Sequence, residues 1–114
     1  MSIEKEVHDM KVRVWLSFDL GVQGDYEGLY RWLDGRKAVE CGDSMTSFMV
    51  ESDADLPGKI KESLEAQVTF SKKARLYLIY KKKDQGYSGK FIIGGRKASP
   101  WQGFAEASSA EEDE

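Results

Sequence analysis

One carboxylate stands out by its place in the chain. Asp19 ends a segment of alternating residues, 11–19, and is followed by a loop that contains Gly21 and Gly24. A carboxylate at the end of a strand can hold Mg²⁺ through its oxygens and through water. An ion held in this way can activate water for attack on a phosphodiester. Asp19 can equally accept hydrogen bonds from backbone amides of the loop, which is the commoner role of aspartate before a turn.

Aromatic and basic side chains alternate with apolar ones in two segments, 11–19 and 74–82. If they share an exposed surface, they would form a stacking platform for single-stranded nucleic acid. The same residue types are enriched in protein interfaces, so the surface could instead be the centre of a homodimer interface or be covered by the chain itself. The residues concerned are Arg13, Trp15, Arg75 and Tyr77.

Charge is distributed unevenly along the chain. Residues 59–97 hold 11 Lys/Arg against 3 Asp/Glu, whereas residues 1–58 hold 6 against 12, and residues 98–114 hold 5 acidic residues and no basic one. A strongly basic third of a domain is a candidate surface for phosphates. Lysines that flank strands also block edge pairing, which is the alternative interpretation. The candidate phosphate-binding residues are Lys72, Lys73, Lys81, Lys82, Lys83, Lys90, Arg96 and Lys97.

Other polar residues have structural interpretations. Asp25 is placed to cap a helix, and Asp43 lies in a Gly-Asp-Ser turn. His8 lies near the N-terminus, so we do not expect it to act as a general base. Cys41 is the single cysteine, which excludes an internal disulfide, and we expect it to be buried and unreactive. One cysteine and one histidine also disfavour a structural zinc site.

Two strands and a helix follow from periodicity. In segment 11–19 every second residue is apolar, which predicts a strand with one buried side. These residues are Val12, Val14, Leu16 and Phe18. Segment 74–82 shows the same alternation. Between Asp25 and Gly35 an apolar stripe predicts a helix, which we expect Gly35 to close in a left-handed conformation.

The remaining segments are predicted from turn and helix signals. Segment 38–51 reads as one interrupted strand or a tight strand pair, and a second helix runs from Leu56 to about residue 66. Residues 83–89 are expected to form a hairpin loop before a returning strand at 90–94. Because tryptophan is rarely left in water, we expect Trp101 and Phe104 to pack back onto the domain.

This order of elements predicts an α+β fold of the ferredoxin-like split β-α-β type. Both helices would cover one face of an antiparallel sheet that carries an extra C-terminal strand. We expect a flexible lead-in over 1–10, a single domain over 11–104 and a disordered acidic tail over 105–114. The chain shows neither a signal peptide nor a membrane-spanning segment, so we expect a cytoplasmic protein with no membrane partner.

The segment Val-Trp-Leu-Ser-Phe-Asp-Leu at 14–20 resembles the first strand of small CRISPR-adaptation nuclease-like proteins and their VapD-type toxin relatives. Ser-Phe-Asp at 17–19 also resembles the first strand of type V antitoxins, and Arg75-Leu-Tyr-Leu-Ile-Tyr80 is similar to a late strand of the first group. In that group the matching aspartate, one from each subunit of a homodimer, binds a divalent metal, and this role carries over to Asp19 alone. Segment 42–48 lacks the Arg-x-Gln-x-Ser-Val-Phe pattern of the group.

The residues and the resemblance together imply a small protein that binds RNA or DNA. The resemblance adds a metal-dependent endoribonuclease of toxin–antitoxin or CRISPR-adaptation type, with Asp19 as catalytic and metal-binding residue, Mg²⁺ as cofactor and a homodimer as the assembly. The alternative is a non-enzymatic interaction module that dimerises through its open sheet face. The residues do not decide between an enzyme and a binding protein.

Overall fold

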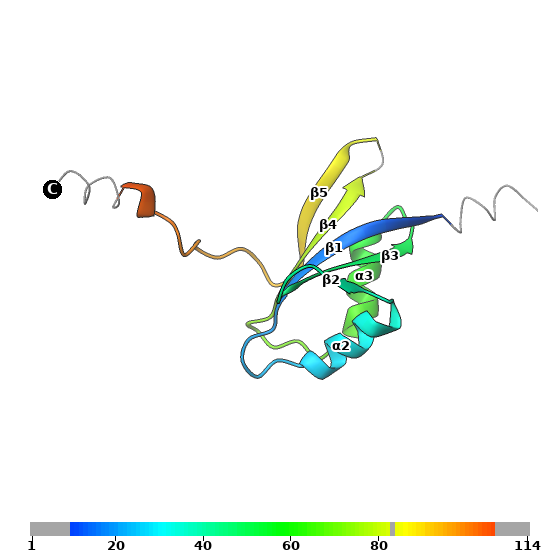
Figure 1. Ribbon diagram of the computed structural model, residues 1–114, viewed down its shortest axis with the longest axis horizontal. Coiled ribbons are helices and arrows are strands. Elements are labelled where there is room, and N and C mark those ends of the chain that lie inside the picture. Colours follow the sequence, from blue (N-terminus) through cyan, green and yellow to red (C-terminus); the bar gives the residue numbers. More distant parts are fainter. Residues whose placement is uncertain (1–9, 83, 107–114) are drawn as a thin grey trace, which may run out of the picture.

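The computed structural model describes residues 10–82 and 84–106, which contain a five-stranded antiparallel sheet (Figure 1). The strands lie in the order β2-β3-β1-β4-β5, so β1 is the central strand. The predicted α+β class and antiparallel sheet are confirmed, and the arrangement is compatible with a ferredoxin-like fold. The elements are β1 (Lys11–Asp19), α2 (Tyr26–Gly35), β2 (Val39–Glu40), β3 (Met45–Glu51), α3 (Leu56–Glu65), β4 (Arg75–Lys82) and β5 (Gly86–Ile93).

Strand β1 has one buried and one open face, as its alternation predicts. Val14, Leu16 and Phe18 are buried beneath the helices, while the residues between them point to the opposite face. β1 pairs with β3 on one side and with β4 on the other, so that Trp15 lies between Ser47 and Ile79. This register places the corresponding residues of three strands on the same open face.

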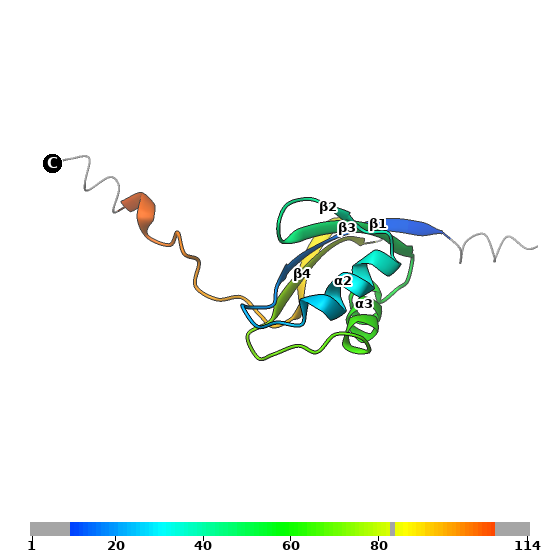
Figure 2. The ribbon, with the colours of Figure 1, turned by 60° about the horizontal axis from the view of Figure 1, so that its bottom comes forward.

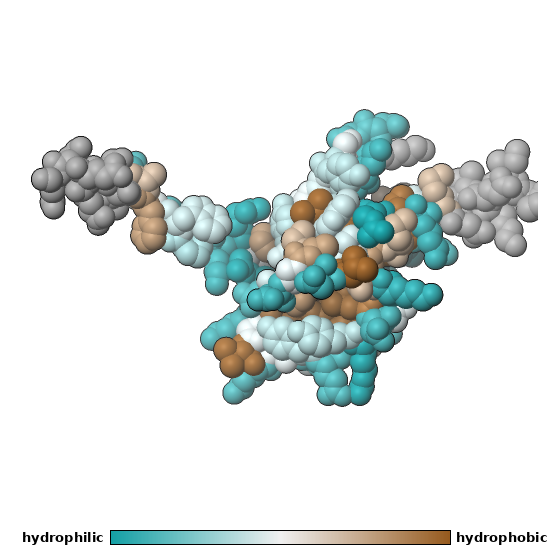
Figure 3. Space-filling view, viewed as in Figure 1, coloured by the Kyte–Doolittle hydropathy of each residue, from teal (hydrophilic) through white to brown (hydrophobic). Residues whose placement is uncertain are grey.

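Helices α2 and α3 both lie on the face of the sheet opposite to that open face (Figure 2). Trp32 of α2 is almost completely buried and meets the ring of Phe48 in β3 edge to face, with centroids 5.3 Å apart. Leu64 of α3 is fully buried in the same cluster. Hydrophobic residues therefore gather between sheet and helices, as the space-filling view shows (Figure 3).

A polar contact joins the two helices at the edge of the core. The indole Nε1 of Trp32 donates to Ser63 Oγ at 3.0 Å, and Arg36 Nη2 donates to the same oxygen at 2.7 Å. The guanidinium of Arg36 lies 3.7 Å from the centre of the Trp32 ring. Burial lowers the pKa of Arg36, whereas the cation–π contact with the Trp32 ring stabilises the charged guanidinium.

Each helix begins at an aspartate followed three residues later by glycine. Asp25 Oδ1 accepts from Gly28 N at 2.9 Å, and Asp55 Oδ1 accepts from Gly58 N at 3.2 Å. A Cβ at either glycine would collide with the carboxylate of its cap. The predicted helix starts are thus confirmed, and α3 ends at Glu65, close to the expected position.

The end of α2 differs from the prediction. Gly35 lies within the helix without a positive φ, and Lys37 instead adopts the left-handed conformation at φ 55°. The amide of Lys37 donates to Asp34 O and the amide of Ala38 to Leu33 O, both at 3.0 Å. These two bonds form the usual left-handed helix stop, but its central position is occupied by lysine.

The β2–β3 and β4–β5 hairpins decide two predictions about the strands: whether segment 38–51 is one strand or two, and where the last strand begins. Segment 38–51 is a strand pair, with β2 and β3 joined by a turn that contains Asp43. The predicted loop over 83–89 is too long. β5 begins at Gly86, and Tyr87 and Gly89 already pair with residues of β4. A register shift near its end leaves both Ile92 and Ile93 buried.

Two predictions about burial are wrong. Trp101 and Phe104 are 72% and 68% exposed, because the chain leaves the sheet after β5 and the helices already fill the core face (Figure 1). Cys41 is exposed, because it lies in the turn after β2, at the edge of the sheet.

Some predictions lie outside the described residues. These are the lead-in before Met10, which includes His8, the tail beyond Glu106, and the role of Lys83. Within 10–82 and 84–106, no helix has the length and apolar character needed to cross a bilayer.

We expect two substitutions at the end of α2 to stabilise the protein. Lys37→Gly removes the cost of a left-handed side-chain residue, and Gly35→Ala lowers the entropy of the unfolded chain at a helical site with open space around it. Each should raise the free energy of unfolding by about 0.5–1 kcal/mol, measured by urea denaturation. Lys37→Ala serves as the control, because it keeps a Cβ at the strained position. Equal stability of Lys37→Gly and Lys37→Ala would contradict the assignment.

Candidate functional site

The open face of the sheet carries four aromatic side chains in two pairs. Trp15 of β1 meets Tyr87 of β5 edge to face with ring centroids 5.8 Å apart. Tyr77 of β4 meets Phe91 of β5 in the same manner at 4.8 Å. The Tyr77 ring lies over Gly89, where a Cβ would leave it no room. The two pairs therefore form one aromatic surface across the three strands.

Basic side chains lie beside this aromatic surface. Arg13 is held across the sheet, because its Nη1 donates to Ser47 Oγ at 2.9 Å and that hydroxyl donates to Val14 O at 2.9 Å. Lys81 is exposed and pairs with Tyr87, which places it on the same face. Because β1 and β4 are antiparallel and Trp15 pairs with Ile79, Arg13 and Lys81 lie at the same end of the aromatic surface.

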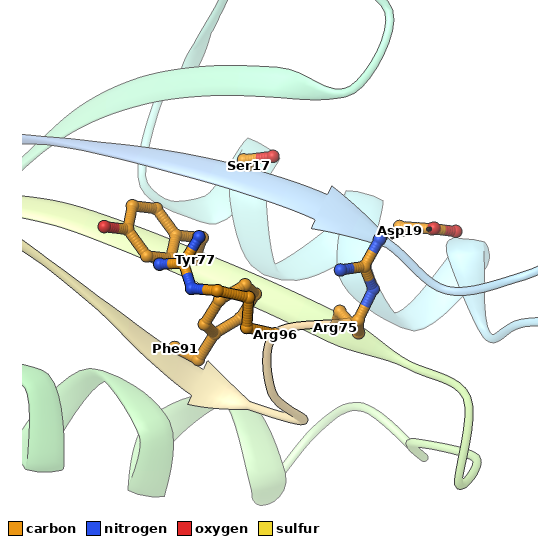
Figure 4. A pocket seen from close by; sticks show the side chains of 6 residues that line it. All are labelled: Ser17, Asp19, Arg75, Tyr77, Phe91 and Arg96. Carbon is orange, nitrogen blue, oxygen red and sulfur yellow. Dashed lines mark ion pairs between the residues drawn. The ribbon is translucent and has the colours of Figure 1, made fainter. Parts of the chain in front are cut away.

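An open pocket of about 330 Å³ lies at the end of this face where β1 ends and β4 begins (Figure 4). Asp19 lies directly across from Arg75, with Oδ2 3.8 Å from Nη2. Asp19 Oδ1 accepts from Gly21 N at 3.1 Å, so the predicted turn-capping role is observed. The lining residues are Ser17, Asp19, Arg75, Tyr77, Phe91 and Arg96.

Arg96 covers the aromatic wall of the pocket. Its Cζ lies 5.4 Å from the ring centre of Phe91 and 6.0 Å from that of Tyr77 (Figure 4). Among the described residues, no carboxylate forms an ion pair with Arg96. A second hollow adjoins the first and adds Lys97 and Trp101 to the wall. This end of the face therefore has more positive than negative charge.

The structure separates the predicted nucleic-acid-binding residues into groups. Arg13, Trp15, Arg75, Tyr77 and Lys81 share the open face, and Arg96 and Lys97 adjoin it. Lys82 and Lys90 pair with Gly86 and the core residue Leu78, which places them on the helix side of the β4–β5 hairpin. Lys72 and Lys73 are exposed in the turn before β4.

Asp19 is the only carboxylate among the residues that line this pocket. No group of three or more His, Cys, Asp or Glu side chains comes together in the parts that the structure describes. Two guanidinium groups lie in the same pocket as Asp19. Because like charges repel, this surrounding favours an anion over a divalent cation in a single chain.

Tyr87 and Phe91 belong to the site, although they are not among the residues that the sequence pattern singles out. With β5 starting at Gly86, the spacing Tyr87-x-Gly89-x-Phe91 places all three on the open face. The alternation of residues 87–91 indicates this arrangement, but the predicted hairpin loop over 83–89 includes Tyr87 and Gly89.

Comparison with protein-family models, with curated proteins and with solved structures finds no match.

Asp25 has a structural role apart from the open face. Its carboxylate caps α2 and also accepts from Thr69 N at 2.9 Å, which ties the start of the helix to the segment after α3. Hydrogen bonds from the amides of Thr69 and Gly28 hold its pKa below the ordinary value of 3.8. The ionised form therefore stabilises the fold.

We expect Asp25→Asn to destabilise the protein at neutral pH and to do so less in acid. The pKa of Asp25 is lower in the folded than in the unfolded protein, so its ionised carboxylate adds to the free energy of unfolding. This contribution is complete above pH 3.8 and is lost as the pH falls through the lower pKa of the folded state. Urea denaturation of both proteins along a pH series would show the difference in unfolding free energy narrowing below that pH. Asp43→Asn, in an exposed turn, is the control. A difference that stays constant into acid would rule out this linkage.

Proposed function

We propose that this protein binds single-stranded nucleic acid, RNA in particular, on the open face of a ferredoxin-like sheet. The observation that supports this most is the set of partly exposed aromatic side chains on adjacent strands, Trp15, Tyr77, Tyr87 and Phe91, with cations beside them. Bases stack on such rings, while Arg and Lys neutralise the phosphates.

The arrangement of the face suits a flexible strand better than a duplex. The ring planes of the two pairs are inclined at 70° and 69°, so one ring of each pair can offer its face to an unpaired base. The bases of a duplex are already stacked on each other. Arg13 and Lys81 lie at one end of the open face, and Arg75 and Arg96 lie at the other. A backbone that runs over the rings from one end of the face to the other would meet cations at both ends.

Metal-dependent cleavage of RNA is a further proposal that rests on the resemblance of segment 14–20 and on Asp19. It requires a second carboxylate from a homodimer partner, because Asp19 is the only carboxylate among the residues that line the pocket. Mg²⁺ would then bind between the Asp19 side chains of the two subunits. The second subunit would cover the pocket end of the open face, so RNA could not cover the whole face.

A second candidate function is self-association through the open face without nucleic acid. Apolar residues at the β2–β3 side favour it, since Val39 is 55% and Met49 42% exposed. Such residues, with Trp15, would form the centre of an interface. In that case Trp15→Ala would dissociate a dimer seen by sedimentation velocity, and RNA would not compete with assembly.

Loss of one stacking ring should weaken RNA binding markedly. We expect Trp15→Ala to reduce the affinity for a uridine decamer about tenfold, because a base stacked on an aromatic side chain contributes about 1–3 kcal/mol. Fluorescence anisotropy at low salt measures the affinity. Tyr30→Ala is the matched control, since Tyr30 is 53% exposed but lies on α2. Failure of the wild-type protein to bind at low salt would exclude the proposal and leave self-association.

The two neighbouring lysines at the end of β4 provide a second test. Lys81 lies on the open face and Lys82 on the other side of the hairpin, so only Lys81→Ala should remove a phosphate contact. The slope of log affinity against log salt should fall by about 0.7 for Lys81→Ala and remain unchanged for Lys82→Ala. Equal effects of the two variants would show that general charge, and not this face, binds the strand.

A further inference from the structure

The pocket at the end of the open face brings together three kinds of side chain. Tyr77 and Phe91 provide an aromatic wall, Arg75 and Arg96 provide guanidinium groups, and Asp19 provides a carboxylate (Figure 4). Aromatic rings and arginine planes stack on bases, guanidinium groups bind phosphate, and carboxylates accept hydrogen bonds from ribose hydroxyls. These are the three parts of one nucleotide.

The spacing of these groups corresponds to a single nucleotide. Asp19 and Arg75 lie opposite each other in neighbouring strands, and Ser17 and Tyr77 form the next pair on this face. Residues two apart in a strand are separated by about 7 Å, so the aromatic wall lies one such step from the charged pair. A base on this wall would take the place that the Arg96 guanidinium occupies over the rings, so Arg96 would turn from the rings to the phosphate. The sugar of the same nucleotide would then lie at Asp19.

The balance of charge indicates which phosphate fits. Arg75 is paired with Asp19, whereas no carboxylate of the described residues forms an ion pair with Arg96. One positive charge is therefore in excess. A phosphodiester within a strand carries one negative charge, while a terminal phosphate carries about −1.5 to −2. The pocket matches an internal nucleotide better than a phosphorylated end.

Asp19 keeps an acceptor for the sugar. Its Oδ1 accepts from Gly21 N, but Oδ2 lies 3.8 Å from Arg75 Nη2, which is too long for a hydrogen bond. The side chain is also 57% exposed. An ionised carboxylate can only accept, and among the sugar groups of an internal nucleotide only the ribose 2′-hydroxyl can donate. DNA has no donor at this position.

We propose that the pocket holds one internal ribonucleotide of the bound strand, with its phosphodiester at Arg96 and its 2′-hydroxyl at Asp19. Asp19 is then the residue that distinguishes RNA from DNA. This inference rests on the proposed function, because it requires a strand bound to the open face.

The test compares a uridine decamer with a deoxyuridine decamer, which differ only in the 2′-hydroxyl groups. The wild-type protein should prefer RNA by about tenfold, the size of a hydrogen bond to a charged group. Asp19→Ala should bring this ratio close to one. Asp19→Asn keeps an acceptor oxygen and the Gly21 turn bond, so it should retain part of the preference. Asp34→Ala, an exposed carboxylate of α2, should leave the ratio unchanged.

The outcomes separate this inference from the proposed function. If the wild-type protein binds neither decamer, the proposed function fails and the inference with it. If it binds both equally, or if Asp19→Ala retains the full preference while melting like wild type, the inference fails and strand binding stands. A general repulsion by Asp19 would raise both affinities equally in Asp19→Ala and leave the ratio unchanged, which also overturns the inference.

Discussion

The structure depends on the two-residue alternation of β1, the central strand of the sheet. Val14, Leu16 and Phe18 are buried under the helices, so the register of β1 against β3 and β4 cannot shift by one residue without exposing them. The same constraint fixes Trp15, Ser17 and Asp19 on the opposite face. Burial of the core residues thus determines which residues of β1 lie on the open face, although the core residues themselves lie on the other side of the sheet.

Much of this arrangement follows from the sequence because it is encoded locally. The alternation of β1 and β4 predicts which face Arg13, Trp15 and Tyr77 occupy. Asp25 predicts where the first helix begins, and the helix signals at Leu56 predict the start of the second. Periodicity and capping are properties of neighbouring residues, and these elements agree with what their own residues favour.

The features that were not predicted have different causes. Lys37 takes the left-handed position in place of Gly35, because the helix stop lies two residues further along the chain than the glycine indicates. Tyr87 and Phe91 join the site because β5 pairs with β4 directly after a tight turn. The contact of Arg96 with Tyr77 and Phe91 depends on how the chain leaves the sheet, which no local pattern specifies.

The pair of Asp-x-x-Gly helix starts has a consequence for the order in which the chain folds. Each start closes over three residues, from Asp25 to Gly28 and from Asp55 to Gly58. The central strand must instead find partners such as Ile79, which lies far along the chain from Trp15. Closing such long loops is slow in comparison with forming a helical turn. We therefore expect both helix starts to form transiently before the sheet, so that docking of β4 beside β1 limits the folding rate.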